Sequence, residues 1–449
     1  MAAVVIIVLP YTFVQAQKTQ EVFEFDLQQC IDYALENNSI VKNAKLNEDI
    51  SDAQVKEYTA IGLPQVNINS GLNYNYKVQR SIVDFSNFDP TLPKGTEGEI
   101  AFGQMYDGNV AISANQLLFD GSFFVGLQAA KTVRELSSKQ FVKSEIDVAQ
   151  NVAKAYFNLL VREEQLLLLE KNSTRLDALL IDIKGMHDQG FVEKIDLSRV
   201  QVQYNNLKVQ LENTRKYVSL SNELLKFQMG MSQNAKLIIV EKIKDIQFDQ
   251  SELVERDFSY NERIEYSELQ TNLMLVNLDM KSTKMQYLPS LYARFNYGYN
   301  TSTSDGGELF KGNRWLNFGV LGATLAVPVF DGFQKKYKIQ RNKLQIQQLE
   351  NNFEMLENSI DLEIKQAKTN VSNSVESMKA QKENMNLAEE VLRITEIKYK
   401  EGVGSNSEVL DADTALKEAQ TNYYNALYEA LVAKIDLDKA YGTLLESKN

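Results

Sequence analysis

Two stretches of this sequence, residues 190–230 and 402–442, share one pattern at an offset of 212 residues. In the second stretch, small or apolar residues recur at alternating spacings of three and four, as in the seam of a coiled-coil helix: Leu416, Ala419, Tyr423, Ala426, Ala430, Ala433, Leu437 and Ala440. The same places in the first stretch are held by Tyr204, Leu207, Leu211, Thr214, Val218, Ser221, Leu225 and Gln228. Both stretches end in a glycine where a helix C-cap is expected. The sequence therefore predicts a duplicated chain.

Each of these stretches follows a long segment without proline. The segments 122–187 and 333–398 carry apolar residues at helical spacing, and the whole chain of 449 residues has only 6 Pro and 21 Gly. Each segment predicts a helix of about 66 residues, about 100 Å long at 1.5 Å per residue. Helices of this length indicate coiled coils or helical hairpins. We expect two long hairpins, 122–230 and 333–442.

Ahead of each hairpin the period of the sequence changes to two. Four segments alternate apolar with small or polar residues and are nearly uncharged: 65–76, 109–119, 290–300 and 317–330. The second and fourth both end in Phe-Asp-Gly motifs. We expect these segments to be strands, with residues 77–108 forming a long loop between the first two.

The repeated order of elements predicts the domain organisation. The first structural repeat covers residues 17–230 and the second covers 257–449, each with two strands and one helical hairpin. Between them lies a less regular segment, 231–256, whose apolar run Leu237–Val240 predicts a small strand packed on the helices.

The N-terminus predicts export from the cytoplasm. Residues 2–9 form an apolar run too short to span a bilayer, and Val14-Gln15-Ala16 is a small-residue cleavage signal. We interpret 1–16 as a signal peptide; a buried N-terminal strand is the alternative. No later apolar run reaches 18 residues, so no transmembrane helix is expected.

Composition excludes several classes of function. The formal net charge of −12 argues against a nucleic-acid partner. A single histidine, His187, and a single cysteine, Cys30, argue against a metal site. The sequence shows no set of a nucleophile, a base and an orienting group like that of an enzyme active site. We therefore expect no cofactor, no metal and no enzymatic activity.

The four strands have the length and polarity of strands that cross a bilayer. The residues expected on the lipid-facing side are Val66, Ile68, Leu72, Val110, Ile112, Leu118, Phe295, Tyr297, Leu321, Leu325 and Val327. Four strands cannot close a barrel, because the smallest known barrels have eight. Transmembrane strands would therefore require an oligomer that shares one barrel. The alternative is a small sheet packed under the helices of a soluble protein.

The order strand, loop, strand, Phe-Asp-Gly, long helix, glycine turn and helix, twice over, resembles the TolC-like outer-membrane efflux proteins. The most specific part is the segment 399–412 (YKEGVGSNSEVLDA), with Ala440-Tyr441-Gly442 at its far end. The resemblance covers nearly the whole chain after residue 16. It implies a mainly α fold with a small β part: a homotrimer with a shared twelve-stranded barrel above a long α-helical periplasmic tunnel.

The resemblance also implies roles for residues near the second glycine turn. The family narrows its pore with two acidic residues one turn apart, which match Glu408 and Asp411. The alternative for this pair is a solvated first turn favoured by the helix dipole. The family also holds its closed state with a latch formed by a tyrosine and an acid, which match Tyr399 and Asp196. The position of the basic residue that completes this latch is occupied by Gly404 here.

The family's tips contact an adaptor protein. The corresponding residues here are His187, Gly190, Val192, Gly402 and Gly404.

Two classes of function follow from these patterns. The first is a passive exit duct in the outer membrane of a Gram-negative bacterium, part of a tripartite efflux or type I secretion system. Its partners would be outer-membrane lipid, a periplasmic adaptor, and an inner-membrane pump or ABC exporter, which selects the substrate and supplies the energy because this chain has no phosphate-binding loop. The second class is a pore-less periplasmic structural coiled-coil protein, which would not need the alternating strands.

Overall fold

A computed structural model describes residues 22–243 and 258–445. The expected signal peptide, residues 1–16, lies outside the described residues, and so do residues 244–256 of the segment between the repeats. The chain forms two compact units. The helical unit comprises residues 1–46, 139–267 and 355–449, and the sheet unit comprises 47–138 and 268–354. Each unit takes segments from both repeats, so the spatial division crosses the expected sequence division.

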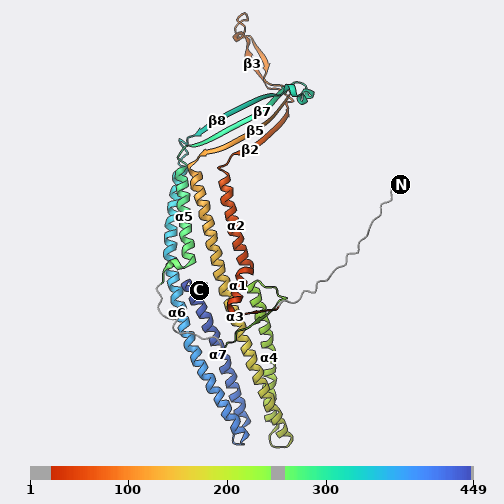
Figure 1. Cartoon of the computed structure of the whole chain (residues 1–449), viewed down its shortest axis with the longest axis vertical. Helices are drawn as coiled ribbons and strands as arrows, with labels where there is room; N and C mark the ends of the chain where they lie inside the picture. Colours follow the sequence, from red (N-terminus) through yellow and green to blue (C-terminus); the bar gives the residue numbers. More distant parts are fainter. Residues whose placement is uncertain (1–21, 244–257, 446–449) are drawn as a thin grey trace, which may run out of the picture. The chain divides into compact units, whose positions relative to one another are not determined.

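The sheet unit contains four long antiparallel strands in the order β2-β5-β7-β8 (Figure 1). Their bounds are β2 Gln65–Tyr74, β5 Tyr106–Phe119, β7 Ser290–Thr303 and β8 Leu316–Ala326. The central pair β5–β7 joins the two repeats, and β2 and β8 are the edges. Both edges leave a row of backbone groups without a strand partner in this sheet.

Two details of the sheet unit differ from the sequence prediction. The strand expected over 317–330 ends at Ala326, because Pro328 has no N–H for a ladder and Phe333 takes a positive φ of 67°. Val327 therefore lies just beyond the strand. The expected loop 77–108 contains a hairpin of β3 Arg80–Asp84 and β4 Glu97–Ala101. Short 3₁₀ turns lie at η1 Phe85–Asn87, η5 Gly306–Phe310 and η6 Gly312–Arg314.

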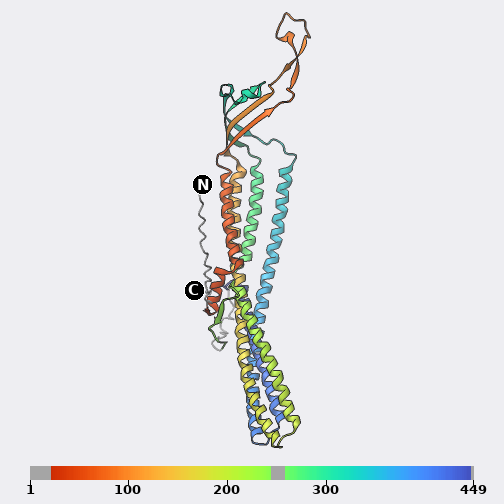
Figure 2. The same ribbon diagram turned by 90° about the vertical axis from the view of Figure 1, so that its right-hand side faces the viewer.

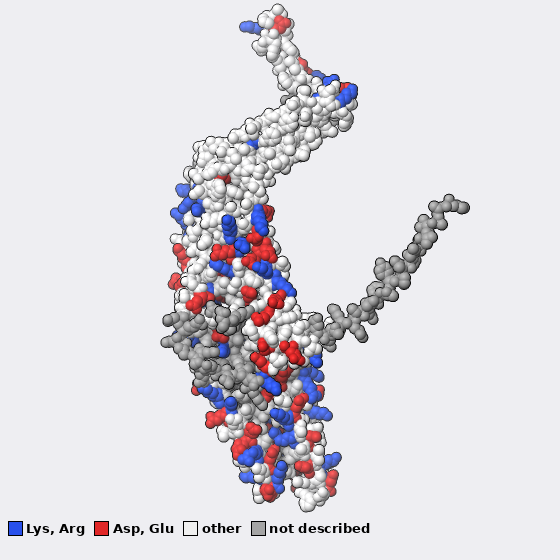
Figure 3. Space-filling view, in the orientation of Figure 1, with Lys and Arg blue, Asp and Glu red and all other residues white. Residues whose placement is uncertain are grey.

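The strand register places the apolar residues of the four strands on one face. Ile68 pairs with Ile112 and Ile112 with Tyr297, while Phe295 pairs with Leu321. These side chains are exposed in the single chain, up to 73% for Ile68 and 82% for Leu321. Leu118 is also exposed but stands at an irregularity of β5, between Leu117 and Phe119. Figure 3 shows the strand surface almost free of charged residues.

The opposite face of the sheet is polar. It carries asparagine and serine residues at paired positions, among them Asn67 opposite Ser113 and Ser113 opposite Asn296. The charged residues of the four long strands are Asp107 and Arg294. Asp107 accepts hydrogen bonds from two asparagine side chains at 2.7 and 2.6 Å. The sheet is thus amphipathic, with one apolar face and one mainly polar face that carries both charged residues.

Long helices contribute residues to both units. They are α2 Ser39–Ala60, α3 Gly121–Asp188, α5 Ile264–Met285 and α6 Gln334–Lys400. The expected helix 122–187 corresponds to α3 and the expected helix 333–398 to α6. Asp120 begins α3, since its carboxylate accepts hydrogen bonds from the backbone and hydroxyl of Ser122 at 2.7 and 2.6 Å.

Within the helical unit, α3 pairs with α4 Lys194–Met229, and α6 pairs with α7 Asn406–Tyr441 (Figures 1 and 2). All of the seam positions predicted on α4 and α7 are buried or half-buried. The largest cluster of the core surrounds Tyr156 and Leu159 of α3, which are fully buried. Against it pack α1 Leu27–Asn37 and a parallel pair of β1 Val22–Phe25 with β6 Lys236–Ile239. The 3₁₀ turn η4 Tyr260–Glu262 precedes α5.

None of the helices in residues 22–243 and 258–445 is long and apolar enough to cross a membrane.

The C-cap of α4 offers a test of the fold. Gly230 has φ 69°, and a Cβ there would stand 2.7 Å from the Asn38 Cα and 2.8 Å from the Asn37 carbonyl oxygen. We expect Gly230→Val to lower the free energy of unfolding by about 2 kcal/mol or more, through backbone strain and the clash. The control is Gly185→Ala in α3, which meets nothing within 4 Å and should raise stability by up to about 1 kcal/mol. Denaturation followed by circular dichroism measures both, and equal effects would contradict this account of the cap.

Candidate functional site

The two hairpins of the helical unit end in nearly identical turns. Gly190 lies between α3 and α4 with φ 80°, and Gly402 lies between α6 and α7 with φ 76°. At each turn the glycine N–H and the next N–H donate to the last carbonyls of the preceding helix, at 2.9 to 3.0 Å. Left-handed backbone explains why glycine occupies both places.

Each turn also presents one apolar side chain to the outside. Phe191 and Val403, the residues after the two glycines, are both 77% exposed. Val192, expected at the contact surface, is half-buried and packs against the core of the first hairpin. The sequence interpretation missed Phe191 and Val403, although an apolar residue after both turn glycines was a usable signal.

His187 lies in the last turn of α3. Its Nδ1 is 3.6 Å from the Oδ1 of Asp188, on the same helix. In the part of the chain that the structure describes, no group of three or more His, Cys, Asp or Glu side chains could hold a metal ion.

Glu408 and Asp411 lie on the exposed face of the first two turns of α7. The backbone N–H of Glu408 donates to the Ser405 hydroxyl at 3.2 Å, so a side-chain cap begins this helix. Neither carboxylate forms an ion pair with a described basic residue. The two acids therefore share one surface of the helix, turned away from the buried Val409 and Leu410.

Tyr399 and Asp196, matched above to a latch, lie near each other but have other partners. The Tyr399 hydroxyl donates to the Met186 Sδ at 3.7 Å. The Asp196 carboxylate lies 3.6 Å from Arg199 on its own helix, while its backbone oxygen accepts from the Asn406 amide at 3.4 Å. Burial, followed by the negative charges of Asp196 and Asp182, raises the pKa of Tyr399. Here the hairpins are joined by the Tyr399–Met186 and Asn406–Asp196 contacts. The latch assigned to Tyr399 and Asp196 stays a prediction.

Gly404 is tightly packed in its turn. A Cβ at this position would stand 3.1 Å from the Lys398 Cβ and 3.1 Å from the Tyr399 backbone nitrogen. A larger side chain would have to displace the end of α6, which gives a steric reason for glycine at this place.

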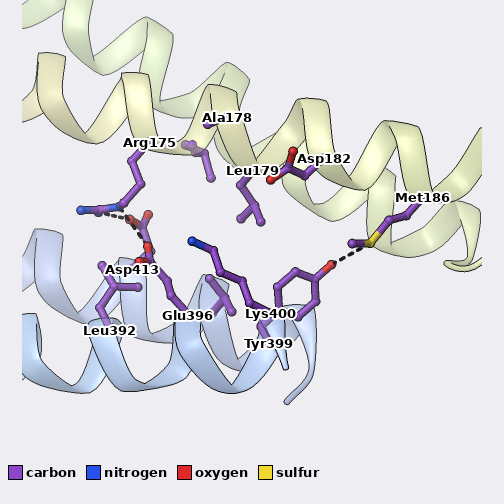
Figure 4. Close-up of a pocket in the computed structure, with 12 residues that line it drawn as sticks. Arg175, Ala178, Leu179, Asp182, Met186, Leu392, Glu396, Tyr399, Lys400 and Asp413 are labelled. Carbon is purple, nitrogen blue, oxygen red and sulfur yellow. Dashed lines mark hydrogen bonds and ion pairs between the residues drawn. The ribbon is translucent and has the colours of Figure 1, made fainter. Parts of the chain in front are cut away.

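A partly buried charge cluster joins the two hairpins one to three turns above the tips (Figure 4). Arg175 of α3 forms an ion pair with Asp413 of α7, and its Nε lies 3.7 Å from the carboxylate of Glu396 on α6. Asp413 is 4% exposed and also contacts Lys417 at 2.5 Å. One arginine thereby connects α3 to both helices of the second hairpin.

Sequence reasoning missed this cluster. Arg175 and Asp413 are 238 residues apart, so no local pattern relates them. Only Asp413 gave a usable signal. It lies on the same helix face as the seam residue Leu416, where an acid is unusual.

The cluster predicts a large effect of removing its arginine. Arg175→Met leaves Asp413 buried with Lys417 as its remaining cation, so we expect the free energy of unfolding to fall by about 2 kcal/mol. Adding Asp413→Leu should recover most of this loss, because the uncompensated charge is removed. The control is Arg215→Met, since Arg215 pairs with Glu170 at the surface and its loss should lower stability much less than Arg175→Met does. Denaturant titration of the four proteins measures these values, and equal losses in both single variants would contradict the cluster's role.

The fold and the tip can now be compared with known proteins. Residues 30–230 and 267–443 match the family described as outer membrane efflux protein. Over 425 residues the chain is 21% identical to the outer membrane protein TolC of Vibrio cholerae, covering 94% of this chain and 91% of that protein. It is 23% identical over 425 residues to the probable efflux pump outer membrane protein TtgC of Pseudomonas putida, covering 93% and 82%.

Solved structures agree on the fold. The open state of the MtrE outer membrane channel of Neisseria gonorrhoeae superposes with a TM-score of 0.72 at 19% identity, over 93% of this chain and 89% of that one. Because the family match spans most of the chain, this protein belongs to the outer membrane efflux protein family and is a TolC-like protein of the outer membrane.

Proposed function

We propose that this protein is a passive exit duct: a homotrimer with one shared β-barrel in the outer membrane and a helical tunnel in the periplasm. An adaptor and an inner-membrane pump or ABC exporter would open its periplasmic tip. The observation that carries the proposal is the amphipathic four-stranded sheet with two free edges.

The edges of the sheet require further strands. In lipid, every backbone N–H and C=O must be paired within protein, and β2 and β8 each leave one side unpaired in the four-stranded sheet. If β8 of one protomer pairs with β2 of the next, three sheets close into one barrel of twelve strands. The exposed apolar face then meets lipid, and the face with Asn67, Ser113 and Asn296 lines the lumen.

The second candidate, a pore-less structural coiled-coil protein, explains the hairpins but not the sheet. A sheet in water would expose side chains such as Ile68 and Leu321, at a cost of about 25 cal/mol per Å² of apolar surface. The same surface is favourable in a bilayer. The relative from Pseudomonas putida is named a probable efflux pump outer membrane protein, which also supports a duct.

The tip supplies the proposed gate. Glu408 and Asp411 have exposed carboxylates on one face of α7. On threefold assembly they would crowd acidic groups around a narrow mouth, as in cation-selective filters. The turns with Phe191 and Val403 would offer the adaptor its apolar contacts.

The mouth gives the first test of this function. We expect Glu408→Gln with Asp411→Asn to lower cation selectivity and to abolish block by multivalent cations, because the crowded carboxylates are lost. Single-channel recording in planar bilayers measures both. The matched control is Glu193→Gln, an exposed acid beside the first turn, which should change neither.

Two results would contradict the assignment. Unchanged selectivity in the double variant would place the constriction elsewhere, leaving Glu408 and Asp411 as a solvated helix start. A monodisperse monomer in detergent that keeps its strand signal would exclude the shared barrel.

The turns give a second test. Phe191→Asp with Val403→Asp should leave the trimer intact and abolish export in cells, because charged side chains cannot enter an apolar adaptor contact. Phe191→Leu with Val403→Ile keeps the contact apolar and should retain export. A bulky residue at Gly402 should also abolish export, since its φ of 76° disfavours any side chain. Full export by the aspartate variant would show that the adaptor docks away from the turns.

A further inference from the structure

A cavity of about 270 Å³ lies inside the helical unit, between α3 of the first hairpin and α6 and α7 of the second (Figure 4). Its floor is apolar and includes Leu176, Leu392 and Val409, which are 1 to 3% exposed. The Arg175–Asp413 ion pair lies at one end, and the contact of the Tyr399 hydroxyl with Met186 lies at the other. The cavity thus occupies the joint between the two hairpins.

One carboxylate of the cavity lining has no ion pair with a described basic residue. Asp413 is compensated by Arg175 and by Lys417, which does not line the cavity, and Glu396 lies 3.7 Å from Arg175. Lys400, the last residue of α6, stands one turn after Glu396 with an exposed side chain. Asp182 is the remaining carboxylate of the lining.

Two acidic groups lie near Tyr399 at one end of the cavity. Burial raises the pKa of Tyr399 first, and the charges of Asp196 and Asp182 raise it further. A cation at this end would find the Asp182 carboxylate and the face of an aromatic ring, both of which attract it.

We propose that this cavity binds a small amphipathic cation, with its apolar group on the floor and its charge beside Asp182 and Tyr399. Ligand pockets are typically apolar with a few polar groups that fix orientation, and they begin at about 300 Å³. The cavity is at this lower limit, so it fits one aromatic ring with a short cationic substituent. A carboxylate ligand held by Lys400 is the competing outcome.

Binding would have a consequence for the tip. A molecule in contact with α3 on one side and α6 and α7 on the other favours the conformation in which these helices keep their present spacing. It would therefore oppose separation of the hairpins. This second step rests on the function proposed above, whereas binding rests on the cavity alone.

The binding step is tested by calorimetric titration of the full-length protein in detergent with benzyltrimethylammonium. Ala178→Phe fills the cavity from α3 and should abolish binding. Asp182→Asn should weaken binding about threefold, the size of one exposed charge pair. Asp188→Asn, an exposed acid of the same helix that does not line the cavity, is the matched control and should bind like the parent.

Three results would overturn the proposal. The first is that the parent does not bind benzyltrimethylammonium. The second is that binding is unchanged in both Ala178→Phe and Asp182→Asn. The third is that 3-phenylpropionate binds instead and that this binding is lost in Lys400→Gln. Leu179→Phe serves as a second filling variant if Ala178→Phe does not assemble.

The effect on the tip is tested separately by single-channel recording. Benzyltrimethylammonium should lower the frequency of opening in the parent and in Asp188→Asn, but not in Ala178→Phe. Binding without any change in opening would overturn the second step. A failure of the proposed duct function would instead appear as the absence of channels with or without the ligand.

Discussion

The two free edges of the sheet are the constraint on which the rest of this molecule depends. A four-stranded antiparallel sheet with one apolar face is stable neither as a monomer in water nor as a monomer in lipid. Strands β2 and β5 come from the first repeat and β7 and β8 from the second, and the β5–β7 pair joins them. Strand β2 corresponds to β7 and β5 to β8 in the duplication, so pairing of the edge β8 with the edge β2 of a neighbouring protomer would repeat the β5–β7 pairing. Such edges are suited to pairing with each other in a closed ring of identical protomers.

The elements that the sequence predicts correctly are those with a strict period and a chemical stop. Helix α3 begins where Asp120 caps it and ends before Gly190, so residues next to each end specify both boundaries. The β3–β4 hairpin escaped prediction because its strands are short and lie in a segment rich in turn residues. The last strand was predicted too long because the alternation continues through Pro328, whereas pairing cannot.

At the candidate site, the sequence does not predict which acidic residues are exposed and which are buried. Glu408, Asp411 and Asp413 are acids within two turns of one helix, yet the first two are exposed and the third is buried. Their roles are set by the face of α7 on which they lie. An exposed acid needs no partner, whereas a buried one requires a cation, which for Asp413 comes both from Lys417 one turn along α7 and from a second cation that only the tertiary fold supplies. Arg175 fulfils that need from 238 residues away.

The identity of residue 404 connects these observations. Glycine fits the tight turn after α6, at the position where the family resemblance implies a basic latch residue. The contacts near the tips that join the hairpins include the Arg175–Asp413 pair, the Asn406 contact with the Asp196 backbone and the Tyr399 contact with Met186. Farther from the tips, Asn172 donates to Gln420 at 3.0 Å and Lys154 pairs with Asp436 at 2.6 Å, so several polar contacts oppose separation of the hairpins. Inverting a closed population from 99:1 to 1:99 requires about 5.5 kcal/mol of differential binding. On the proposed function, an adaptor that inverts such a population must therefore bind the open tip about 10⁴-fold more tightly than the closed tip.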